Sequence, residues 1–370
     1  MNGTTPAEAG ETGGEESTSL QLLPVEEQVV VITGASSGIG LVTARTAARR
    51  GAAVVLAGRN EQALAQVAQE IRDAGGRAVH VVADVGKEDD VARIAAAAVA
   101  EFGRFDTWVN NAGVSIFGQV DQVSTADMHR MFDTVYWGVV HGSRAAIEHF
   151  RDRRGPAGAI VNVGSFFGDR APSLQSTCSS AKFAVHGFTE AMRVEMAAEG
   201  VPVTLLHPGR IDTPYNEHAQ AYTGRQPAHR GMIYPPEAVA EAVLHAAAHP
   251  VRDLFIGGQS KALVLLSQAA PRLVDRVMRT YGYSSQVAER PSGDNEASAL
   301  HHAGYGLHER GTHQGRWYRR RSYYLELEKH RTAAVAALVG AGTALVGWSS
   351  ARRAVRNPRS QSVFAGRART

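Results

Sequence analysis

The chain of 370 residues contains a single cysteine, Cys178. One cysteine excludes an intrachain disulfide and any metal site built from several thiolates. A reducing compartment suits such a chain, and we expect a cytoplasmic protein. Residues 1–20 also lack the basic leader and the apolar run of a secretory signal peptide.

The N-terminal end of the chain lacks positive charge, and the C-terminal end has little negative charge. Residues 1–27 contain six Glu and no Lys or Arg, and their composition predicts a disordered acidic N-terminus. From His301 to the end, thirteen Lys or Arg stand against three Glu. A basic tail of this kind suits an anionic membrane surface, whereas nucleic acid is not the partner we expect. A solvated tail without a partner is the alternative.

Long hydrophobic runs are also rare. The 19 residues 332–350 carry no charge, which just reaches the length of a membrane span. Much of this run is Ala and Gly, so two interpretations stay open. Residues 332–370 would form either a membrane-associated helix with a basic tail or a helix that packs against protein in a homo-oligomer.

Between these ends, short β-branched runs alternate with Ala-rich periodic stretches. The predicted buried strands are 29–33, 53–57, 78–82, 107–109, 159–163, 203–206 and 254–256, and the main predicted helices are 61–73, 89–101, 126–150 and 179–198. This alternation predicts an α/β fold with a doubly wound, parallel, Rossmann-type sheet over residues 28–260. Residues 261–331 should form a helical and loop extension, with an amphipathic helix at 261–278 and an extended loop over 281–314.

A glycine loop follows the first strand directly. In the segment Thr33-Gly34-Ala35-Ser36-Ser37-Gly38-Ile39-Gly40, the first glycine allows a tight turn and the second allows a pyrophosphate to approach. The third lets helix and strand pack closely. Because backbone amides at a helix N-terminus attract phosphate, this loop predicts a dinucleotide site.

Further motifs follow in a fixed order. Asn110-Asn111-Ala112-Gly113 follows the fourth strand, Ser165 lies 13 residues before Cys178, and Pro208-Gly209 precedes Thr213. Together with the glycine loop, they resemble the short-chain dehydrogenase/reductase family over residues 28–257. The resemblance implies hydride transfer between a nicotinamide cofactor and a small carbonyl or alcohol substrate. It also implies cofactor contacts at Asp84, Val85, Asn111, Pro208, Gly209 and Thr213.

Arg59 bears on the choice of cofactor. It follows the second strand, where relatives that prefer NAD carry an acidic residue for the ribose 2′-hydroxyl. This chain has small residues there, Ala57 and Gly58, and then a cation that suits a 2′-phosphate. We therefore expect NADP(H) to be preferred over NAD(H).

Two of the four catalytic positions that the resemblance implies are retained. Ser165 would orient the substrate oxygen, and Lys182 would hold the ribose. Cys178 stands where the family has its proton-donating tyrosine, four residues before Lys182 on one helix face. Val135 stands where the family has the asparagine of its proton relay.

A thiol is acidic enough to replace a phenol, but its sulfur lies only one bond beyond Cβ. A general acid must come within hydrogen-bond reach of its target, directly or through one water. One hypothesis is therefore an oxidoreductase in which Cys178, or a water beside it, handles the proton. A second is a catalytically silent NADP(H)-binding sensor or interaction module. A third is covalent chemistry at Cys178.

The loop after Thr213-Pro214 is the predicted substrate lid, with residues 215–219 within it.

Overall fold

The computed structural model describes residues 21–330, apart from 154, 156, 229, 293–297, 313–317 and 320–321. The predicted apolar segment 332–350, the tail beyond it and most of the acidic N-terminus lie outside the described residues. Across the part of the chain that is described, no helix is long and apolar enough to cross a membrane.

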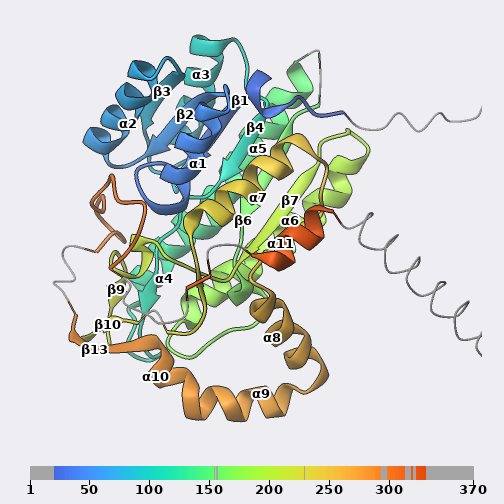
Figure 1. Cartoon of the computed structure of the whole chain (residues 1–370). Coiled ribbons are helices and arrows are strands. Elements are labelled where there is room, and N and C mark those ends of the chain that lie inside the picture. The colour runs from blue at the N-terminus through green and yellow to red at the C-terminus, as the bar shows by residue number, and fades with distance from the viewer. Residues whose placement is uncertain are drawn as a thin grey trace, which may run out of the picture.

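Seven parallel strands form one sheet in the order β12-β7-β6-β4-β1-β2-β3 (Figure 1). They are β1 (Val29–Thr33), β2 (Ala53–Gly58), β3 (Arg77–Val82), β4 (Thr107–Asn110), β6 (Ala159–Val163), β7 (Val203–Pro208) and β12 (Asp253–Ile256). The two ends of each predicted strand lie within two residues of the ends of an observed strand. β1, β2, β4 and β6 are buried along their whole length, as expected for β-branched runs covered on both faces.

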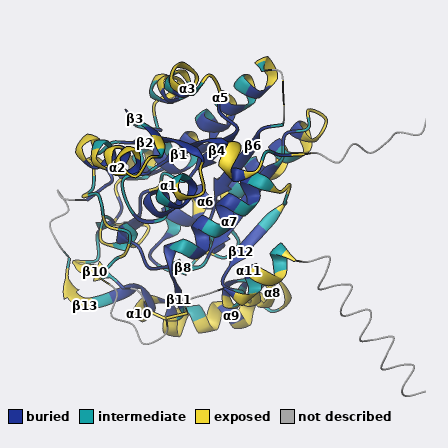
Figure 2. Ribbon diagram, turned by 45° about the horizontal axis from the view of Figure 1, so that its top comes forward, coloured by how far each residue is buried: buried dark blue, intermediate teal, exposed yellow. Residues whose placement is uncertain are grey.

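Helices cover both faces of this sheet. The first face carries α1 (Gly38–Arg49), α2 (Glu61–Asp73) and α7 (Pro236–Ala248), and the second carries α3 (Glu88–Phe102), α5 (Gly138–Asp152) and α6 (Ser176–Ala197). Each layer closes its own apolar core against the strands, so the central strands lie buried between them, while the edge strand β3 is partly exposed (Figure 2). The doubly wound, Rossmann-type α/β fold is confirmed.

The prediction of one regular helix at 126–150 is wrong in one respect. The structure divides it into α4 (Thr125–Phe132), a π-helical turn η2 (Asp133–Trp137) and α5. Val135 lies in this turn with its side chain fully buried. π-helical turns inside helices are frequent at functional sites.

The helix predicted at 261–278 is also interrupted. It consists of α8 (Gly258–Ala269) and α9 (Pro271–Val277), followed by the π-helical turn η5 (Met278–Gly282). Pro271 disfavours helical geometry in the residue before it, and Ala270 has φ −140° and ψ 64°. The break follows directly from that proline.

Part of the predicted loop at 281–314 is ordered. α10 (Tyr283–Gln286) leads into β13 (Val287–Pro291), which pairs with β10 (Arg225–Pro227). The other short elements are η1 (Val25–Glu27), β5 (Ile116–Phe117), η3 (Phe166–Gly168), β8 (Arg210–Ile211), η4 (Pro214–Asn216), β9 (Gln220–Ala221), β11 (Ile233–Tyr234) and α11 (Tyr323–Lys329). Because η1 buries Val25, the structured part of the chain begins before residue 28, earlier than predicted.

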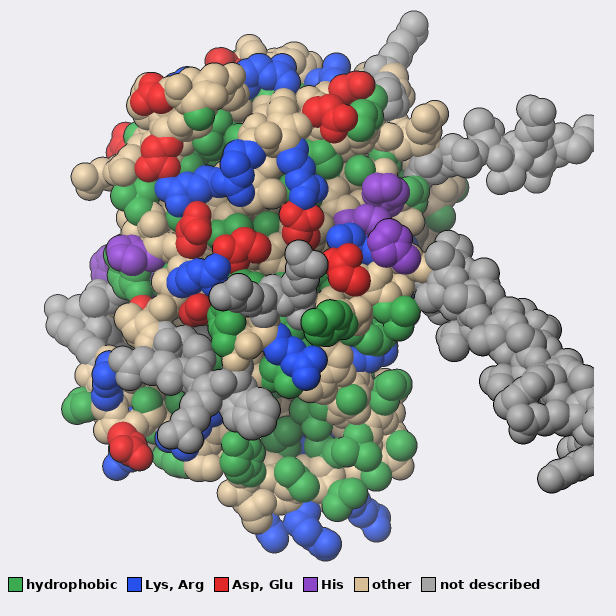
Figure 3. Space-filling view, in the orientation of Figure 1, with side chains coloured by type: hydrophobic (Ala, Val, Ile, Leu, Met, Phe, Trp, Pro, Cys, Tyr) green, Lys and Arg blue, Asp and Glu red, His purple; other side chains and the backbone are tan. Residues whose placement is uncertain are grey.

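The helices α8 and α9 present an apolar outer face. Leu265, Leu266, Leu273 and Val277 are each about half exposed. Hydrophobic side chains gather where these helices lie in Figure 1, with basic side chains beside them (Figure 3). The predicted homo-oligomer stays a prediction.

Candidate functional site

A pocket opens at the carboxyl ends of the strands. It lies where β1 and β4 are neighbours and the strand order reverses, the position at which parallel sheets of this kind form a crevice. It collects every site residue predicted from the sequence except Gly40. These residues are Gly34, Ser36, Ser37, Gly38, Ile39, Arg59, Asp84, Val85, Asn111, Ser165, Cys178, Lys182, Pro208, Gly209 and Thr213. Segments from the whole length of the fold therefore meet in one place.

The glycine loop has the geometry that its sequence predicts. Gly34 has φ +68°, a conformation that favours glycine, and a Cβ there would lie 2.9 Å from Ala112 Cα. Gly40 lies behind the loop, where a Cβ would meet the carbonyl oxygen of Gly34 at 2.2 Å. Gly40 thus allows close packing of helix and strand without reaching the pocket.

Asn111 holds the glycine loop against β4. Its side-chain amide donates to the carbonyl oxygen of Thr33 at 2.8 Å, and its backbone amide donates to the Thr33 hydroxyl at 2.9 Å. The neighbouring Asn110 points into the core, where its amide donates to Asn162 Oδ1 at 2.8 Å. These bonds fix the floor of the pocket.

Lys182 lies one turn beyond Cys178 on α6. Its ammonium donates to the carbonyl oxygen of Val163 at 2.8 Å, and only 8% of the residue is exposed. Burial lowers the pKa of Lys182 to about 8, and Cys178 opposes this shift. The lysine is therefore poised to change charge near neutral pH.

Cys178 is packed as a small hydrophobic residue. It is 2% exposed and lies in an apolar cluster with Val114, Val135 and Ala181. Burial raises the pKa of its thiol, although Lys182 opposes the effect. A buried thiol with a raised pKa is a poor nucleophile, which weighs against covalent chemistry there.

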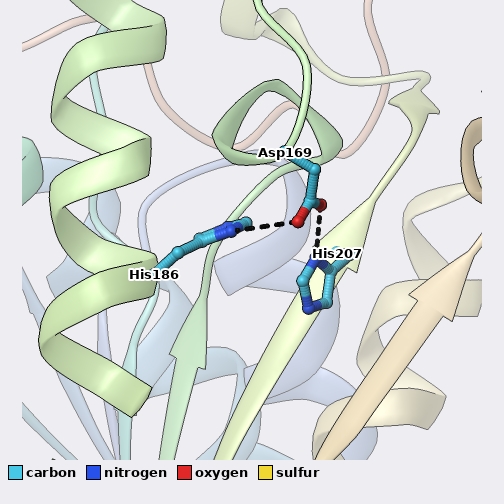
Figure 4. Close-up of side chains that lie close together, drawn as sticks. All are labelled: Asp169, His186 and His207. Carbon is cyan, nitrogen blue, oxygen red and sulfur yellow. Dashed lines mark hydrogen bonds and ion pairs between the residues drawn. The ribbon is translucent and has the colours of Figure 1, made fainter. Parts of the chain in front are cut away.

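Ser165 begins the short turn η3, and its hydroxyl accepts from the backbone amide of Phe167 at 3.1 Å. Below this turn, His186 and His207 face the carboxylate of Asp169 from two sides (Figure 4). The distances from Asp169 oxygens to the two Nδ1 atoms are 3.5 Å for His186 and 2.8 Å for His207. A Cβ on Gly168 would meet the His186 ring at 2.5 Å, so His186 supports the serine turn from below.

Pro208, Gly209 and Thr213 form the wall opposite the glycine loop. Gly209 donates its amide to the carbonyl oxygen of Ile256 at 2.8 Å, and a Cβ on it would lie 2.7 Å from Ser260 Oγ. Thr213 approaches Gly38 so closely that a Cβ on the glycine would lie 3.2 Å from Thr213 Cβ. The two loops therefore enclose the middle of the pocket.

The far end of the pocket is formed by Arg59, Asp84 and Val85. Arg130 donates to the Asp84 carboxylate at 2.6 Å. The Arg59 guanidinium donates to the carbonyl oxygens of Ala299 and Leu300. Burial lowers the pKa of Arg59, and nearby Arg130 adds to the effect.

Ala299 and Leu300 belong to a segment that we call the strap, residues 298–312. The strap runs beside α1 and α2 and roofs this end of the pocket with Ala303, Gly304 and Tyr305 (Figure 1). Its backbone makes two hydrogen bonds to the glycine loop. The Leu307 amide donates to the carbonyl oxygen of Ser36 at 2.8 Å, and the carbonyl oxygen of His308 accepts from the Gly38 amide at 2.9 Å. No sequence motif marks the strap, because its two hydrogen bonds to the glycine loop are made by backbone groups.

The predicted lid contributes Tyr215, which lies in η4. Its hydroxyl donates to the carbonyl oxygen of Val114 at 2.8 Å and lies 3.8 Å from Cys178 Sγ. The sequence places this residue in a lid but contains no signal for its contact with α6.

The glycine loop after the first strand, Ser165 and Lys182 lie in one pocket of a parallel sheet. This arrangement is typical of a Rossmann-type α/β oxidoreductase. A family model described as short chain dehydrogenase matches residues 28–223, and the chain belongs to this family.

One similar protein is the "Uncharacterized oxidoreductase YxnA" of Bacillus subtilis, 57% identical over 339 residues that cover 91% of this chain and 94% of that protein. A solved short chain dehydrogenase/reductase from Burkholderia phymatum in complex with NAD is 26% identical, with a TM-score of 0.61 over 74% of this chain and 99% of that chain. An alcohol dehydrogenase from Thermococcus sibiricus complexed with 5-hydroxy-NADP is also 26% identical, with a TM-score of 0.54 over 62% and 95% of the two chains. The length of the first alignment means that it includes the strap.

Proposed function

We propose that this protein is an oxidoreductase that transfers hydride between NADP(H) and a small carbonyl or alcohol substrate. The observation that carries the proposal is the convergence of Ser165, Lys182 and the glycine loop on one pocket. The Burkholderia and Thermococcus proteins, each solved with a nicotinamide dinucleotide, support this class of cofactor.

The residues present fit such a cofactor. The Gly38 amide donates to His308, but the Ser37 side chain does not cap α1, so the amides that follow Gly38 at that helix N-terminus suit a phosphate. Gly34 and Gly38 keep side chains out of its path. When bound, a nicotinamide cofactor supplies or accepts the hydride. Lys182 would hold its ribose, Ser165 would orient the substrate oxygen, and Asn111, Pro208, Gly209 and Thr213 would shape the nicotinamide end.

The preference for NADP(H) rests on Arg59 and on the lack of a carboxylate at the end of β2, where Ala57 and Gly58 stand. A guanidinium has five N–H donors, so its bonds to Ala299 and Leu300 leave others for a 2′-phosphate. Calorimetric titration should show tighter binding of NADP⁺ than of NAD⁺, and Arg59→Ala should reduce the difference. Equal affinities in the wild type would contradict the preference.

The activity itself is tested with a panel of aldehydes, ketones and secondary alcohols and with both cofactors. We expect turnover in the wild type and a loss of at least about 100-fold in kcat/KM for Lys182→Ala, because both ribose binding and charge are removed. The exposed variant Lys87→Ala serves as control and should retain wild-type turnover.

A second candidate is a silent NADP(H)-binding sensor or interaction module. The burial of Cys178 and Val135 in one apolar cluster favours it, since neither side chain relays a proton there. Nucleotide binding without turnover on any substrate of the panel would support this candidate over the enzyme.

A further inference from the structure

A phenol stands beside the position where the sequence lacks one. Tyr215 comes from the lid, and its hydroxyl lies 3.8 Å from Cys178 Sγ. Since the sulfur is one bond beyond Cβ, this hydroxyl lies within the length of a tyrosine side chain from Cβ of residue 178.

The surroundings of Tyr215 suit a proton donor. Its ring borders the same pocket as Ser165 and Lys182, and its Cε2 atom lies 3.8 Å from the place of a Cβ on Gly113. Burial raises the pKa of Tyr215, with a contribution from neighbouring Cys178, so the phenol stays protonated at neutral pH. Tyr215 is nevertheless partly exposed, and it lines the pocket.

The other candidates are placed less well. Cys178 borders the pocket, but it is 2% exposed and packed in an apolar cluster, and its side chain is short. Tyr136 lies next to Val135, but its ring packs edge-on against Phe188 at 6.2 Å between centroids and does not line the pocket.

We propose that Tyr215 is the catalytic proton donor and acceptor of this protein, supplied from the lid instead of from α6. The inference rests on the proposed function. In the reductive direction, hydride adds to the carbonyl carbon and the π electron pair moves onto oxygen. That oxygen takes the Tyr215 proton in place of the Val114 carbonyl oxygen, to which the hydroxyl donates in this structure. The phenolate left behind takes a proton from water. In the oxidative direction the phenol first gives its proton to water, and the phenolate then accepts the alcohol proton.

A proton donor on the lid would also explain why α6 carries a small residue at position 178. The thiol lies 3.8 Å from the Tyr215 hydroxyl and leaves room for it, whereas a tyrosine at position 178 would need more space. Cys178 is then a positioning residue that Tyr215 packs against.

The kinetic test compares Tyr215→Phe with Tyr136→Phe as a matched control. We expect Tyr215→Phe to lower kcat by about 100-fold or more, the usual contribution of a general acid, while the Kd for NADP⁺ changes little. The pH profile of kcat should lose the limb that belongs to the phenol. Tyr136→Phe should keep wild-type kcat. The double variant Cys178→Tyr/Tyr215→Ala, which returns the phenol to α6 and removes the ring at position 215, should regain activity relative to Tyr215→Ala.

A second measurement does not depend on turnover. Tyrosinate absorption is titrated with and without NADP⁺ in the wild type and in Tyr215→Phe. One titrating phenol should be missing from the variant, and NADP⁺ should lower the pKa of that phenol by about 1 unit or more, because the cationic ring and Lys182 favour the phenolate.

The outcomes separate the two proposals. A wild type that turns over while Tyr215→Phe keeps its kcat would overturn the role of Tyr215 and leave the oxidoreductase standing. A wild type without turnover removes the oxidoreductase and the catalytic role of Tyr215 with it. In a wild type that turns over, a Tyr215 phenol that ignores NADP⁺ would also reject the inference.

Discussion

At the scale of single residues, Lys182 connects burial to ligand binding. The low dielectric around its ammonium disfavours the charged form, which lowers its pKa to about 8. An anionic nucleotide that contacts this group would favour the charged form again. The charge of Lys182 and the binding of the nucleotide should therefore be linked.

We predict that NADP⁺ affinity falls as pH rises through the pKa of Lys182, by about tenfold between pH 7 and pH 9. Calorimetric titration across this range would measure it. Lys182→Met should bind more weakly and show a flat profile, because the titrating group is gone. A flat profile in the wild type would show that the ammonium does not contact the nucleotide.

At the scale of elements, the strap turns an open crevice into a covered one. It bonds the glycine loop through the Leu307 amide and the His308 carbonyl, and it bonds α1 through the ion pair between Arg45 and Glu309, with 2.8 Å between the charged atoms. A nucleotide in this pocket would be enclosed by the strap at the end near Arg59. Exchange of the nucleotide should then require the strap to move.

Gly306 offers a test, because a Cβ on it would lie 2.2 Å from Ala63 Cβ. We predict that Gly306→Val displaces the strap and raises the dissociation rate of NADPH on the order of tenfold, measured by stopped-flow fluorescence. The control is Gly187→Ala, since a Cβ on Gly187 meets nothing within 4 Å. It should leave the rate unchanged. Identical rates in all three proteins would mean that the strap does not limit exchange.

At the scale of the whole molecule, the side chains of Asp169, His186 and His207 connect η3, α6 and β7. Burial lowers the pKa of His207, but its hydrogen bonds to Asp169 and Asp253 outweigh burial, and the net shift is upward. A raised pKa contributes stability that is fully present below the ordinary histidine pKa of about 6.5 and is lost as pH rises through the folded value. Asp169 should thus stabilise the fold more at pH 6 than at pH 9.

We predict that Asp169→Asn lowers the free energy of unfolding by about 2 kcal/mol at pH 6, the usual range for hydrogen bonds to charged groups, and by less at pH 9. Thermal unfolding at both pH values would measure the difference. Asp121→Asn, at an exposed position, should show no such pH dependence. An equal loss at both pH values would show that His207 does not carry the effect.

Much of this arrangement could be predicted from the chain alone, because it depends on local patterns. Continuous burial of β1 and β6 on both faces selects β-branched residues, and the positive φ of Gly34 selects glycine. The i, i+4 relation of Cys178 and Lys182 likewise requires only that α6 is a helix. The interruption at Pro271 was also visible in the sequence, since a proline there disfavours a continuous helix.

Only the tertiary structure decided what surrounds Cys178. Tyr215 is distant in sequence, and its hydroxyl reaches the thiol because the lid folds back over the carboxyl ends of the strands. The strap contacts the glycine loop mainly through backbone groups, and such contacts leave no trace in residue identity. Local periodicity thus determined the sheet and the glycine loop, while long-range packing decided which phenol stands beside the thiol and what covers the pocket.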